Sequence, residues 1–532
     1  MGIPALWKVL RPAAQSRTLT QITVSEGFKT QRNEVGTISL GLDASLLLNR
    51  AQWAAYHQRN QGISMQAGEN LPLQILFWQV CRLLALPIST IFVFDGPGRP
   101  SIKRGETVKT APHALMRPFR ELIRHAGFHS YIAPGEAEAE LAKLNLIGEI
   151  DAVVTDDIDT FLFGATHILR TSNIVQDGDY VSIYTSTAIY DHPSIQLTRA
   201  HFLLIAVLSG GDYSNGIPGC GIATAHRLST NTMLADELFA ATVNLTHTEL
   251  LVFLQGWRTA LKRQLAEDPD RFLGRQLKAV ANAIPARFPD IDVLYNYVHP
   301  VTSWSADGDG PDISGWRNRE LDLPVLAFWC EKYFSWGSNV CIRSLLKPFN
   351  LDDALAEHAS GHVAGTHNMH SNILAIRRCS LGPGPPSKSP NTWGYNITVE
   401  PHTLILTTLS LLTADVRELE LSQPPKTFSM WLPAAILKHT LPGMVTRFHA
   451  TGKGEPNEYI VSPLLSVSPV PHLNESVEEA LGHGSGTASD PIIVDDDECP
   501  GLFNGDNVMQ SSVAAGPSYR ARLLLARLDE LV

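Results

Sequence analysis

Carboxylates mark the ends of three apolar runs near the start of the chain. LGLDAS contains Asp43, IFVFDGP contains Asp95, and AVVTDDIDTFLFG contains Asp157 and Asp159. Continuous apolar runs of this kind predict strands buried in a parallel sheet, whose carboxyl ends form the crevice where ligands bind. We therefore expect these four acids to converge at one edge of a sheet.

Further acids follow a predicted turn in APGEAEAE. Glu136, Glu138 and Glu140 fall in the first turns of the helix expected there, where helical spacing pairs Glu136 with Glu140 and directs Glu138 to another face. Spacing alone does not choose among them. Asp212, which follows an apolar helix and two glycines, is a further candidate for the same edge.

Taken one at a time, these acids are more simply explained as turn formers, helix caps or partners of a helix dipole. As a set they are different, because carboxylates within a few ångströms repel one another unless a cation neutralises them. Oxygen ligands without His or Cys select Mg²⁺, with Mn²⁺ as a substitute. Two such ions, about 3.5 to 4 Å apart, would stabilise the attacking and leaving oxygens of a phosphodiester.

The surrounding sequence predicts the elements that would position these acids. Over roughly the first 220 residues, strand-like runs such as TIFVFDGP alternate with helix-like runs such as LPLQILFWQVCRLLAL, which predicts a parallel α/β sheet. From His201 to about Asn350 the pattern is mostly helical, with a glycine-rich turn, GGDYSNGIPGCG, between the first two helices. A second unit starts near His370 and ends near Phe448. In it NILAIRRC, WGYNITVE and TLILTTLSLL predict strands, and MWLPAAILKHTL predicts a helix.

Composition narrows the class of protein. The chain has 532 residues, of which 44% are hydrophobic and 18% charged, as expected of several folded domains. No apolar run approaches the roughly 18 residues of a membrane span, so we expect no membrane partner. The six cysteines lack zinc-site spacing, which favours the cytosol or nucleus. The net charge of −11 argues against a nucleic-acid partner, yet a metal-dependent nuclease needs a basic surface only where it touches phosphate.

Six segments carry a family resemblance. MGIPALW, LGLDAS, VFDGPGRP, APGEAEAELA, VVTDDIDTFLFG and SGGDYSNGIPGCG occur in this order within about the first 230 residues, and together they resemble the XPG/flap-endonuclease superfamily of structure-selective 5′ nucleases. The resemblance implies a PIN-like nuclease core with a parallel sheet and two Mg²⁺ ions. It selects Glu138 over Glu140. The metal-binding and catalytic acids it implies are Asp43, Asp95, Glu136, Glu138, Asp157, Asp159 and Asp212.

The resemblance also implies DNA-binding residues near these acids. Gly2, exposed once the initiator methionine is removed, would lie beside the active site near the DNA. Lys103, Arg104 and Lys109 resemble basic residues at the base of the family's arch that steer the scissile phosphate. Thr110 stands where a second arch cation is expected, and a solvated charged face is the alternative explanation for the three cations.

The segment GIPGCG resembles the family's helix-hairpin turn that holds one strand of duplex DNA. Its glycines Gly216, Gly219 and Gly221 would let backbone N–H groups approach a phosphate, with a monovalent cation bridging. Relatives often carry a basic residue directly after this turn. This chain does not, so the duplex is held less tightly or Arg227 takes that role.

The spacing of the motifs favours one branch of the superfamily. The interval from Asp95 to Glu136 has no room for the long insert of the XPG repair nuclease and is shorter than the arch of the flap enzymes. FPDIDVLYNYVHP, LAFWCEKYFSWG and SLLKPF resemble the helical extension of Gen/Yen-type Holliday-junction resolvases, and the second unit resembles their chromodomain-like module. Arg377, Arg378 and Lys438 are the DNA contacts that such a module would add.

The expected domains follow from these resemblances. They are an XPG N/I nuclease core (1–190), a helix-hairpin-helix DNA-binding and helical extension (191–355), a chromodomain-like α+β module (367–450) and a mostly disordered tail (451–532). Within the tail, DPIIVDDDEC resembles a SUMO-interacting strand, which implies a SUMO-modified partner. The final SYRARLLLARLDELV is a candidate amphipathic helix.

The expected function is that of a nuclear, Mg²⁺-dependent endonuclease that cuts branched DNA, most like a Gen/Yen-type Holliday-junction resolvase in recombination and repair. Symmetric incision implies a dimer on the junction. One alternative is a 5′-flap or replication-fork endonuclease. An alternative of another class is a non-catalytic scaffold that binds branched DNA, which the retention of all seven acids disfavours.

Overall fold

A computed structural model describes most of the chain up to residue 451. The described residues are 2–3, 5–28, 37–60, 70–103, 105–108, 113–171, 180–305, 308–313, 316, 321–334, 373–382, 392–400, 406–421 and 427–451. The SUMO-like strand and the candidate C-terminal helix of the sequence analysis lie outside these residues. Among the described helices, none is both long enough and apolar enough to cross a membrane.

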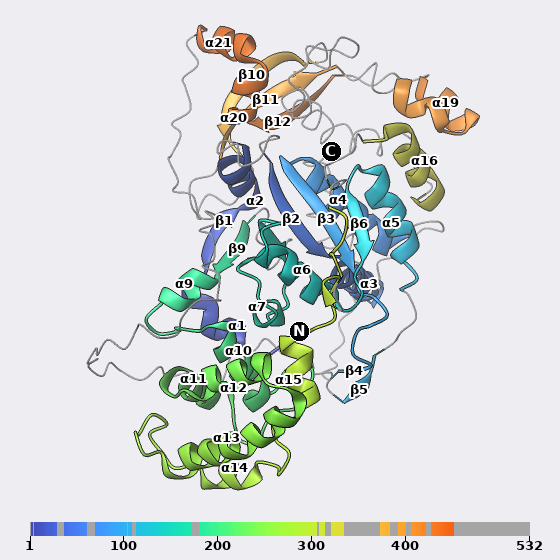
Figure 1. Cartoon of the computed structure of the whole chain (residues 1–532). Coiled ribbons are helices and arrows are strands. Elements are labelled where there is room, and N and C mark those ends of the chain that lie inside the picture. The colour runs from blue at the N-terminus through green and yellow to red at the C-terminus, as the bar shows by residue number, and fades with distance from the viewer. Residues whose placement is uncertain are drawn as a thin grey trace, which may run out of the picture. The chain divides into compact units, whose positions relative to one another are not determined.

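A seven-stranded sheet lies at the centre of the predicted nuclease core (Figure 1). Its order is β1 (Gln15–Thr18), β9 (Tyr180–Thr185), β8 (His167–Arg170), β7 (Ala152–Val154), β2 (Ile38–Asp43), β3 (Ile88–Phe94) and β6 (His129–Ile132). The five strands from β8 to β6 are parallel, as predicted.

The β1–β9 edge of the sheet is antiparallel, which the prediction of a parallel sheet did not include. β9 runs antiparallel to both β8 and β1. The segment between Arg170 and Tyr180 is shorter than the crossover of roughly a dozen residues that a parallel pair requires, so the chain turns back as a hairpin. β1 is short and begins with polar residues, which is why no strand was expected there.

Both faces of the sheet are covered, and the side chains of β3 show how. Ile91 and Val93 belong to the core cluster that includes α6 (Ala137–Leu146) and α10 (Arg199–Ser209). Phe92 and Phe94 belong to the cluster on the other face, with α4 (Leu71–Leu84) and α5 (Met116–His125). Because successive side chains of a strand point to opposite faces, a sheet buried on both sides needs an unbroken apolar run.

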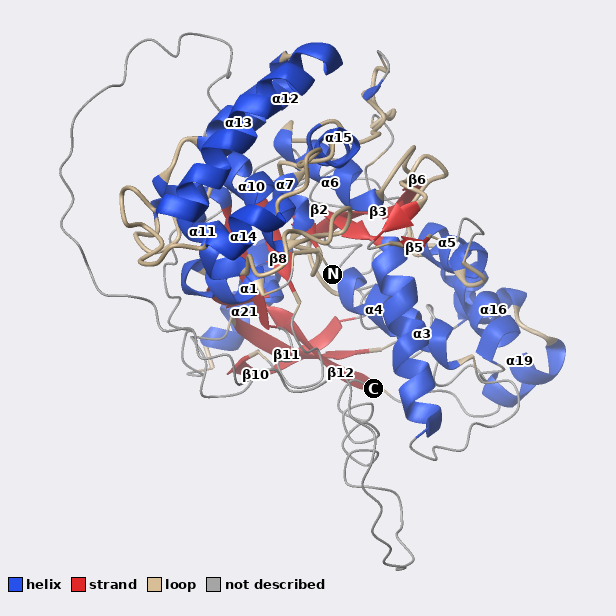
Figure 2. Ribbon diagram, turned by 90° about the horizontal axis from the view of Figure 1, so that it is seen from below, coloured by secondary structure: helices blue, strands red, loops and turns tan. Residues whose placement is uncertain are grey.

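Helices build the extension that was predicted after the core. It contains α10, α11 (Ile222–Asn231), α12 (Leu234–Asn244), α13 (His247–Glu267), α14 (Lys278–Ala283) and α15 (Ile291–Val298), which Figure 2 shows as one group. Capping boxes at Thr198 and Thr246 begin α10 and α13, as their Ser/Thr-x-x-acceptor spacing allows.

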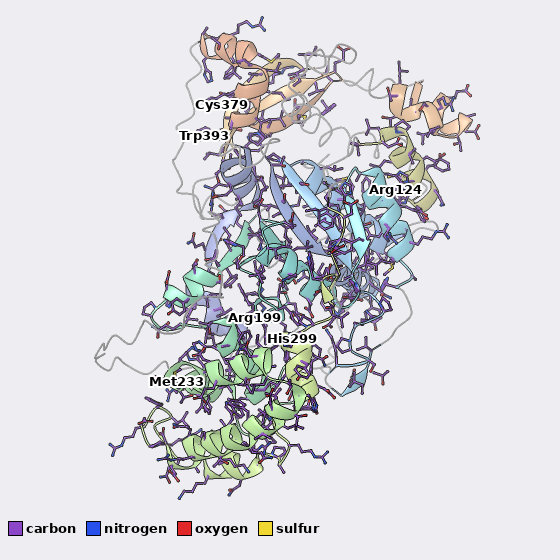
Figure 3. The ribbon with its side chains drawn as sticks, viewed as in Figure 1. Arg124, Arg199, Met233, His299, Cys379 and Trp393 are labelled. Carbon is purple, nitrogen blue, oxygen red and sulfur yellow. The ribbon has the colours of Figure 1, made fainter. Side chains whose placement is uncertain are left out.

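Two basic side chains, labelled in Figure 3, hold this extension together, and one of them, Arg199, also connects it to the core. Arg199 of α10 donates hydrogen bonds to the carbonyl oxygens of Leu162, at 2.7 Å, and Val298, at 3.3 Å. His299, directly after α15, is 3.2 Å from the carbonyl oxygen of Thr242 through its Nε2. After α15 the chain continues to α16 (Leu323–Phe334), where Tyr333 donates a hydrogen bond to Glu121 of α5.

The unit predicted between residues 367 and 450 contains a three-stranded antiparallel sheet. Its strands are β10 (Ile373–Leu381), β11 (Trp393–Val399) and β12 (Phe428–Pro433), and α20 (Ala434–Thr440) and α21 (Pro442–His449) follow. Tyr395, Ile397 and Val399 of β11 are fully buried in one cluster with side chains of both helices. Cys379 of β10 and Trp393 of β11, labelled in Figure 3, pack against this cluster.

Two predictions for this unit were wrong. The described part of TLILTTLSLL is helical and includes the short helix η5 (Leu409–Leu411). Leu409 and Leu412, three residues apart, are both buried with the side chains of α16, and this packing overrides the strand propensity of the segment. The predicted helix MWLPAAILKHTL begins as the end of β12 and becomes helical only at Ala434.

Candidate metal centre

The seven predicted acids gather at the carboxyl edge of the parallel strands. Asp43 ends β2, Asp95 follows β3, and Asp157 and Asp159 follow β7. Glu136 and Glu138 stand at the start of α6, and Asp212 follows α10. We call these residues the acid cluster: Asp43, Asp95, Glu136, Glu138, Asp157, Asp159 and Asp212.

Three members of the acid cluster are arranged as cation ligands would be. Glu138, Asp157 and Asp212 are buried, and each offers one carboxylate oxygen within 4.8 Å of the other two. Asp157 Oδ2 and Asp159 Oδ2 are buried and accept no hydrogen bond from the described residues. A buried carboxylate oxygen without a donor is unfavourable, so a cation is the partner that these atoms fit.

Backbone hydrogen bonds shape the loop after β7. The Asp157 backbone N–H donates to the Thr155 hydroxyl oxygen at 3.0 Å, and the Asp159 N–H donates to Asp157 Oδ1 at 3.1 Å. The second bond occupies Asp157 Oδ1 and leaves Oδ2 buried without a hydrogen bond from the described residues. The loop therefore presents a carboxylate that its own hydrogen bonds orient.

The start of α6 shows which of Glu136, Glu138 and Glu140 lie with the other acids of the cluster. Glu136 is the N-cap: its carbonyl oxygen accepts the Glu140 N–H at 3.2 Å, but its backbone angles are extended (φ −83°, ψ 138°), so helical spacing does not set the direction of its side chain. Glu138 then lies with Asp157 and Asp212. Glu140 instead accepts hydrogen bonds from the Tyr131 hydroxyl and the Ser303 backbone N–H, both at 2.9 Å.

Asp95 fixes the position of α6 relative to β3. Its Oδ1 accepts the Ala137 backbone N–H at 3.0 Å, and Arg99 lies 3.2 Å from its Oδ2. The Asp95 backbone N–H donates to the Ser45 hydroxyl at 2.9 Å, in the first turn of α3 (Ala44–Asn60). The acid thus connects the ends of β2, β3 and α6.

Burial of like charges raises the pKa of several acids. Desolvation is the main cause for Glu138 and Asp159, whose pKa values lie well above the usual range, and the Asp157 carboxylate adds to both shifts. Burial, with Asp95 nearby, raises the pKa of Asp43 to about 7. Burial also raises the pKa of Glu136, against the opposing effect of Lys103. The acid cluster therefore holds negative charge at neutral pH only with compensating positive charge.

Lys103 supplies part of that charge. It lies in a small hairpin of β4 (Ile102–Lys103) and β5 (Glu106–Thr107), visible in Figure 1. Its ammonium group forms an ion pair with Glu136 and lies 3.4 Å from Glu138 and 3.3 Å from Asp212. Burial disfavours the ammonium, but these three carboxylates outweigh burial and raise the pKa of Lys103. Arg104 and Lys109, its predicted companions, lie outside the described residues.

Gly2 contacts the acid cluster through its backbone. Its N–H donates to Asp212 Oδ1 at 3.2 Å, and the N–H of Ile3 donates to Asp159 Oδ1 at 3.1 Å. Gly2 has φ +78°, and a Cβ there would lie 2.6 Å from oxygens of both Asp157 and Asp159. Glycine is therefore required at this position by conformation and by space.

The structure adds residues that sequence reasoning missed. The Tyr213 hydroxyl donates a hydrogen bond to Glu136. Asp156 forms ion pairs with Arg50 and Arg170, and its carbonyl oxygen accepts the Trp7 indole N–H at 2.9 Å. The only available signal for Tyr213 and Asp156 was their adjacency to predicted acids, because their partners are far away in sequence.

The predicted DNA-binding turn lies between α10 and α11. Gly216 and Gly219 have φ values of +71° and +83°, which favour glycine, whereas Gly221 is the N-cap of α11 with open space beside it. Arg227, the suggested replacement for a basic residue after the turn, donates a hydrogen bond to the Leu273 carbonyl oxygen at 3.3 Å. In the C-terminal unit, Arg377 donates to the Thr398 hydroxyl at 2.7 Å and Arg378 is exposed.

Comparison with known proteins gives two family matches and several relatives. Residues 1–113 match the XPG N-terminal domain and residues 127–212 the XPG I-region. The mouse DNA excision repair protein ERCC-5 is 29% identical over 220 residues, which cover 41% of this chain and 17% of the relative. Human Flap endonuclease GEN homolog 1 is 27% identical over 248 residues, covering 43% of this chain and 25% of the relative. The matches thus span about a sixth to a quarter of these relatives' length.

Solved structures show the same fold. A eukaryotic junction-resolving enzyme, GEN-1 binding with potassium, superposes with a TM-score of 0.66 at 25% identity, over 85% of this chain and 100% of that chain. The Holliday junction-resolving enzyme GEN1 in complex with product DNA and Mg²⁺ gives 0.63 at 24% identity, with the same coverage. The chain thus contains an XPG N-terminal domain and an XPG I-region, joined in the fold of these junction-resolving enzymes.

Proposed function

We propose that this protein is a Mg²⁺-dependent, structure-selective DNA endonuclease that resolves Holliday junctions. The observation that carries the proposal is the acid cluster, in which two buried carboxylate oxygens receive no hydrogen bond from the described residues. The similarity to GEN-1 supports the choice of a junction over other branched DNA.

The acid cluster is suited to bind two hard divalent cations. Its donors are carboxylate oxygens, which suit Mg²⁺ and Mn²⁺. Glu138, Asp157 and Asp212 would hold one ion, with Asp159 and Glu136 beside them. When bound, the ions supply Lewis-acid stabilisation of phosphodiester oxygens and lower the pKa of bound water. The expected products are a 5′-phosphate and a 3′-hydroxyl.

The chain's own residues orient this chemistry. Tyr213 holds one carboxylate oxygen of Glu136, while Gly2 and Ile3 hold Asp212 and Asp159 through backbone N–H groups. Lys103 is placed to receive a phosphate once cations compete for its carboxylates, since it is 22% exposed. These contacts favour a fixed acid geometry before DNA arrives.

Duplex DNA would be held by the helical extension. The turn with Gly216, Gly219 and Gly221 precedes α11 and offers backbone N–H groups to a phosphate. A monovalent cation at this turn is part of the proposal, and GEN-1 was solved with potassium. The remaining DNA contacts would come from Arg104 and Lys109 and from the 367–450 unit, if it acts as a chromodomain-like module.

Several features of the proposal concern the whole protein. It acts in the nucleus, as the DNA-repair relatives suggest, and two subunits meet on one junction to make paired nicks. The domains are those predicted at 1–190, 191–355, 367–450 and 451–532. The tail carries the docking strand for a SUMO-modified partner.

A second candidate is a 5′-flap or replication-fork endonuclease. The name of the human relative, Flap endonuclease GEN homolog 1, favours this alternative. The two functions share the acid cluster and differ in the DNA that the extension accepts, so only substrate choice distinguishes them.

The test is cleavage of end-labelled, immobile Holliday junctions and matched 5′ flaps in Mg²⁺, with incision sites mapped on opposing junction strands. We expect symmetric paired nicks that require Mg²⁺ or Mn²⁺. Cleavage of flaps alone would assign the protein to the flap-nuclease branch. Binding of both substrates without cleavage of either would instead support a non-catalytic scaffold.

A further inference from the structure

Glu140 is the acid of the GEAEAE run that the metal centre does not use. It is fully buried, with 0% of its surface exposed. Its two carboxylate oxygens accept hydrogen bonds from the Tyr131 hydroxyl of β6 and from the Ser303 backbone N–H, each at 2.9 Å. A buried carboxylate thus connects α6, the edge strand of the sheet and a segment that follows the helical extension.

We call residues 299–305 of that segment the strap. It begins directly after α15 and lies against the turns that carry two acids of the cluster. A Cβ at Gly135 would lie 2.3 Å from the Val301 carbonyl oxygen, and a Cβ at Gly98 would lie 3.4 Å from Val301 Cγ1. His299 and Val301 also line a small cavity with Glu136.

The turn that carries Glu136 is held from two sides. On one side, the Gly96 and Gly98 N–H groups, just after Asp95, donate to the carbonyl oxygens of Gly135 at 2.7 Å and Pro134 at 2.8 Å. On the other side lies Val301 of the strap. The strap therefore supports the residue directly before Glu136, and a Cβ at Gly135 has no room because the contact is so close.

The segment beyond the strap is attached to the same strand. Trp316 stacks on Tyr131 with ring centroids 5.5 Å apart, and its carbonyl oxygen accepts the Ser89 hydroxyl at 3.3 Å. Tyr131 thus contacts both Glu140 and Trp316. Glu140 holds the strap at Ser303 through the backbone N–H of that residue.

We propose that Glu140 is a positioning residue for the metal centre. By holding Ser303, it keeps the strap against Gly135, and this fixes the direction of the Glu136 and Glu138 carboxylates that follow Gly135. The inference rests on the proposed function, since it assigns Glu140 a role toward the divalent ions. A carboxylate that only stabilised the core would leave metal affinity unchanged when replaced.

Two substitutions separate these roles. Glu140→Gln keeps both contacts, because its amide oxygen accepts the Ser303 N–H and its NH₂ group donates to the Tyr131 oxygen. Glu140→Leu is of similar size and removes both acceptors. Leu144→Ala, at another fully buried position of α6, is the control for loss of stability without loss of the strap contact.

The measurement is Mn²⁺ binding by the full chain without DNA, followed by electron paramagnetic resonance, together with hydrogen–deuterium exchange of the strap amides. Glu140→Leu should weaken Mn²⁺ binding about 10-fold, the usual effect of losing a residue that orients metal ligands, and should speed exchange at Ser303. Glu140→Gln should restore both. Leu144→Ala should lower the unfolding midpoint and leave Mn²⁺ affinity within about 2-fold of the wild type.

The outcomes distinguish this inference from the proposed function. The inference alone would be overturned if Glu140→Leu bound Mn²⁺ as tightly as the wild type. It would also be overturned if Leu144→Ala weakened Mn²⁺ binding as much as Glu140→Leu does. Failure of the wild-type protein to bind Mn²⁺ would overturn the proposed metal centre and the inference with it. If Glu140→Leu does not fold, Val301→Gly tests the same support from a position that is 46% exposed, and it should also weaken Mn²⁺ binding.

Discussion

Two groups of charged side chains lie beside the loop after β7. In one group carboxylates outnumber cations, and in the other cations outnumber carboxylates. On one side is the acid cluster, where Lys103 contacts three carboxylates and two buried carboxylate oxygens have no donor among the described residues. On the other side, Asp156 forms ion pairs with the guanidinium groups of Arg50 and Arg170. We call these three residues the arginine cluster.

The difference teaches that residue type alone does not identify a ligand. Asp156 and Asp157 are neighbours in sequence, yet one is neutralised by arginines and the other faces like charges. Burial differs in the same direction, because the Asp156 side chain is 23% exposed while Asp157 is buried. An excess of buried negative charge is what marks the metal centre.

The largest expected effect comes from removing two acids of the cluster. The double substitution Glu136→Ala and Glu138→Ala should lower Mg²⁺-dependent cleavage by at least about 10³-fold, since metal ions contribute several kcal/mol of transition-state stabilisation. Junction binding in Ca²⁺ should survive, because the helical extension is untouched. Single-turnover cleavage and a gel-shift titration measure the two effects. Cleavage by this variant at a near wild-type rate would show that the acids are not ligands.

A smaller effect of opposite sign is expected at Lys103. Lys103→Met removes a cation that competes for Glu136, Glu138 and Asp212, so Mn²⁺ should bind roughly 3- to 10-fold more tightly, given Coulomb energies on the order of 1 kcal/mol after screening. Cleavage at saturating metal should nevertheless fall, because a phosphate contact is lost.

Lys143→Met is the matched control, since it removes one positive charge from the last turn of α6. Its Mn²⁺ affinity should stay near that of the wild type. Weaker Mn²⁺ binding by Lys103→Met would mean that the ammonium supports the metal centre and does not compete for its ligands.

The positions of four acids of the cluster could be predicted from the sequence, because strand ends are local features. Asp43, Asp95, Asp157 and Asp159 each end or follow an apolar run, and parallel topology brings such ends together. Their role as ligands stays a prediction. The choice of Glu138 over Glu140 could not be made from spacing, since it depends on Glu136 being a cap, and a resemblance to relatives made it instead.

Other parts were not predictable because they depend on contacts between distant segments. Lys103 and Asp212 are 109 residues apart, and no periodic pattern connects them. The hydroxyl of Tyr213 meets Glu136 across 77 residues. The helical turn at Leu409 and the antiparallel β1–β9 edge likewise reflect packing that overrides local propensity.

A modest effect is expected in the arginine cluster. Asp156→Asn should lower the free energy of unfolding by about 1 kcal/mol or less, because these side chains are 23% to 33% exposed and solvent weakens their attraction. Cleavage should stay within about 3-fold of the wild type. Urea unfolding and cleavage assays on one preparation measure both. A loss of cleavage as large as that of the acid double variant would erase the distinction between the two clusters.

The smallest effect is expected from removing the tail. Both clusters lie between Gly2 and Asp212, and the described structure reaches Thr451, just beyond α21. The tail is rich in Ser, Pro, Gly and Asp and resembles a carrier of partner motifs. Deleting the residues after about Ala450 should therefore leave the intrinsic rate of junction cleavage unchanged. A truncated protein that still folds, judged by circular dichroism, but has lost cleavage would show that the metal centre depends on the tail as well as on its own charges.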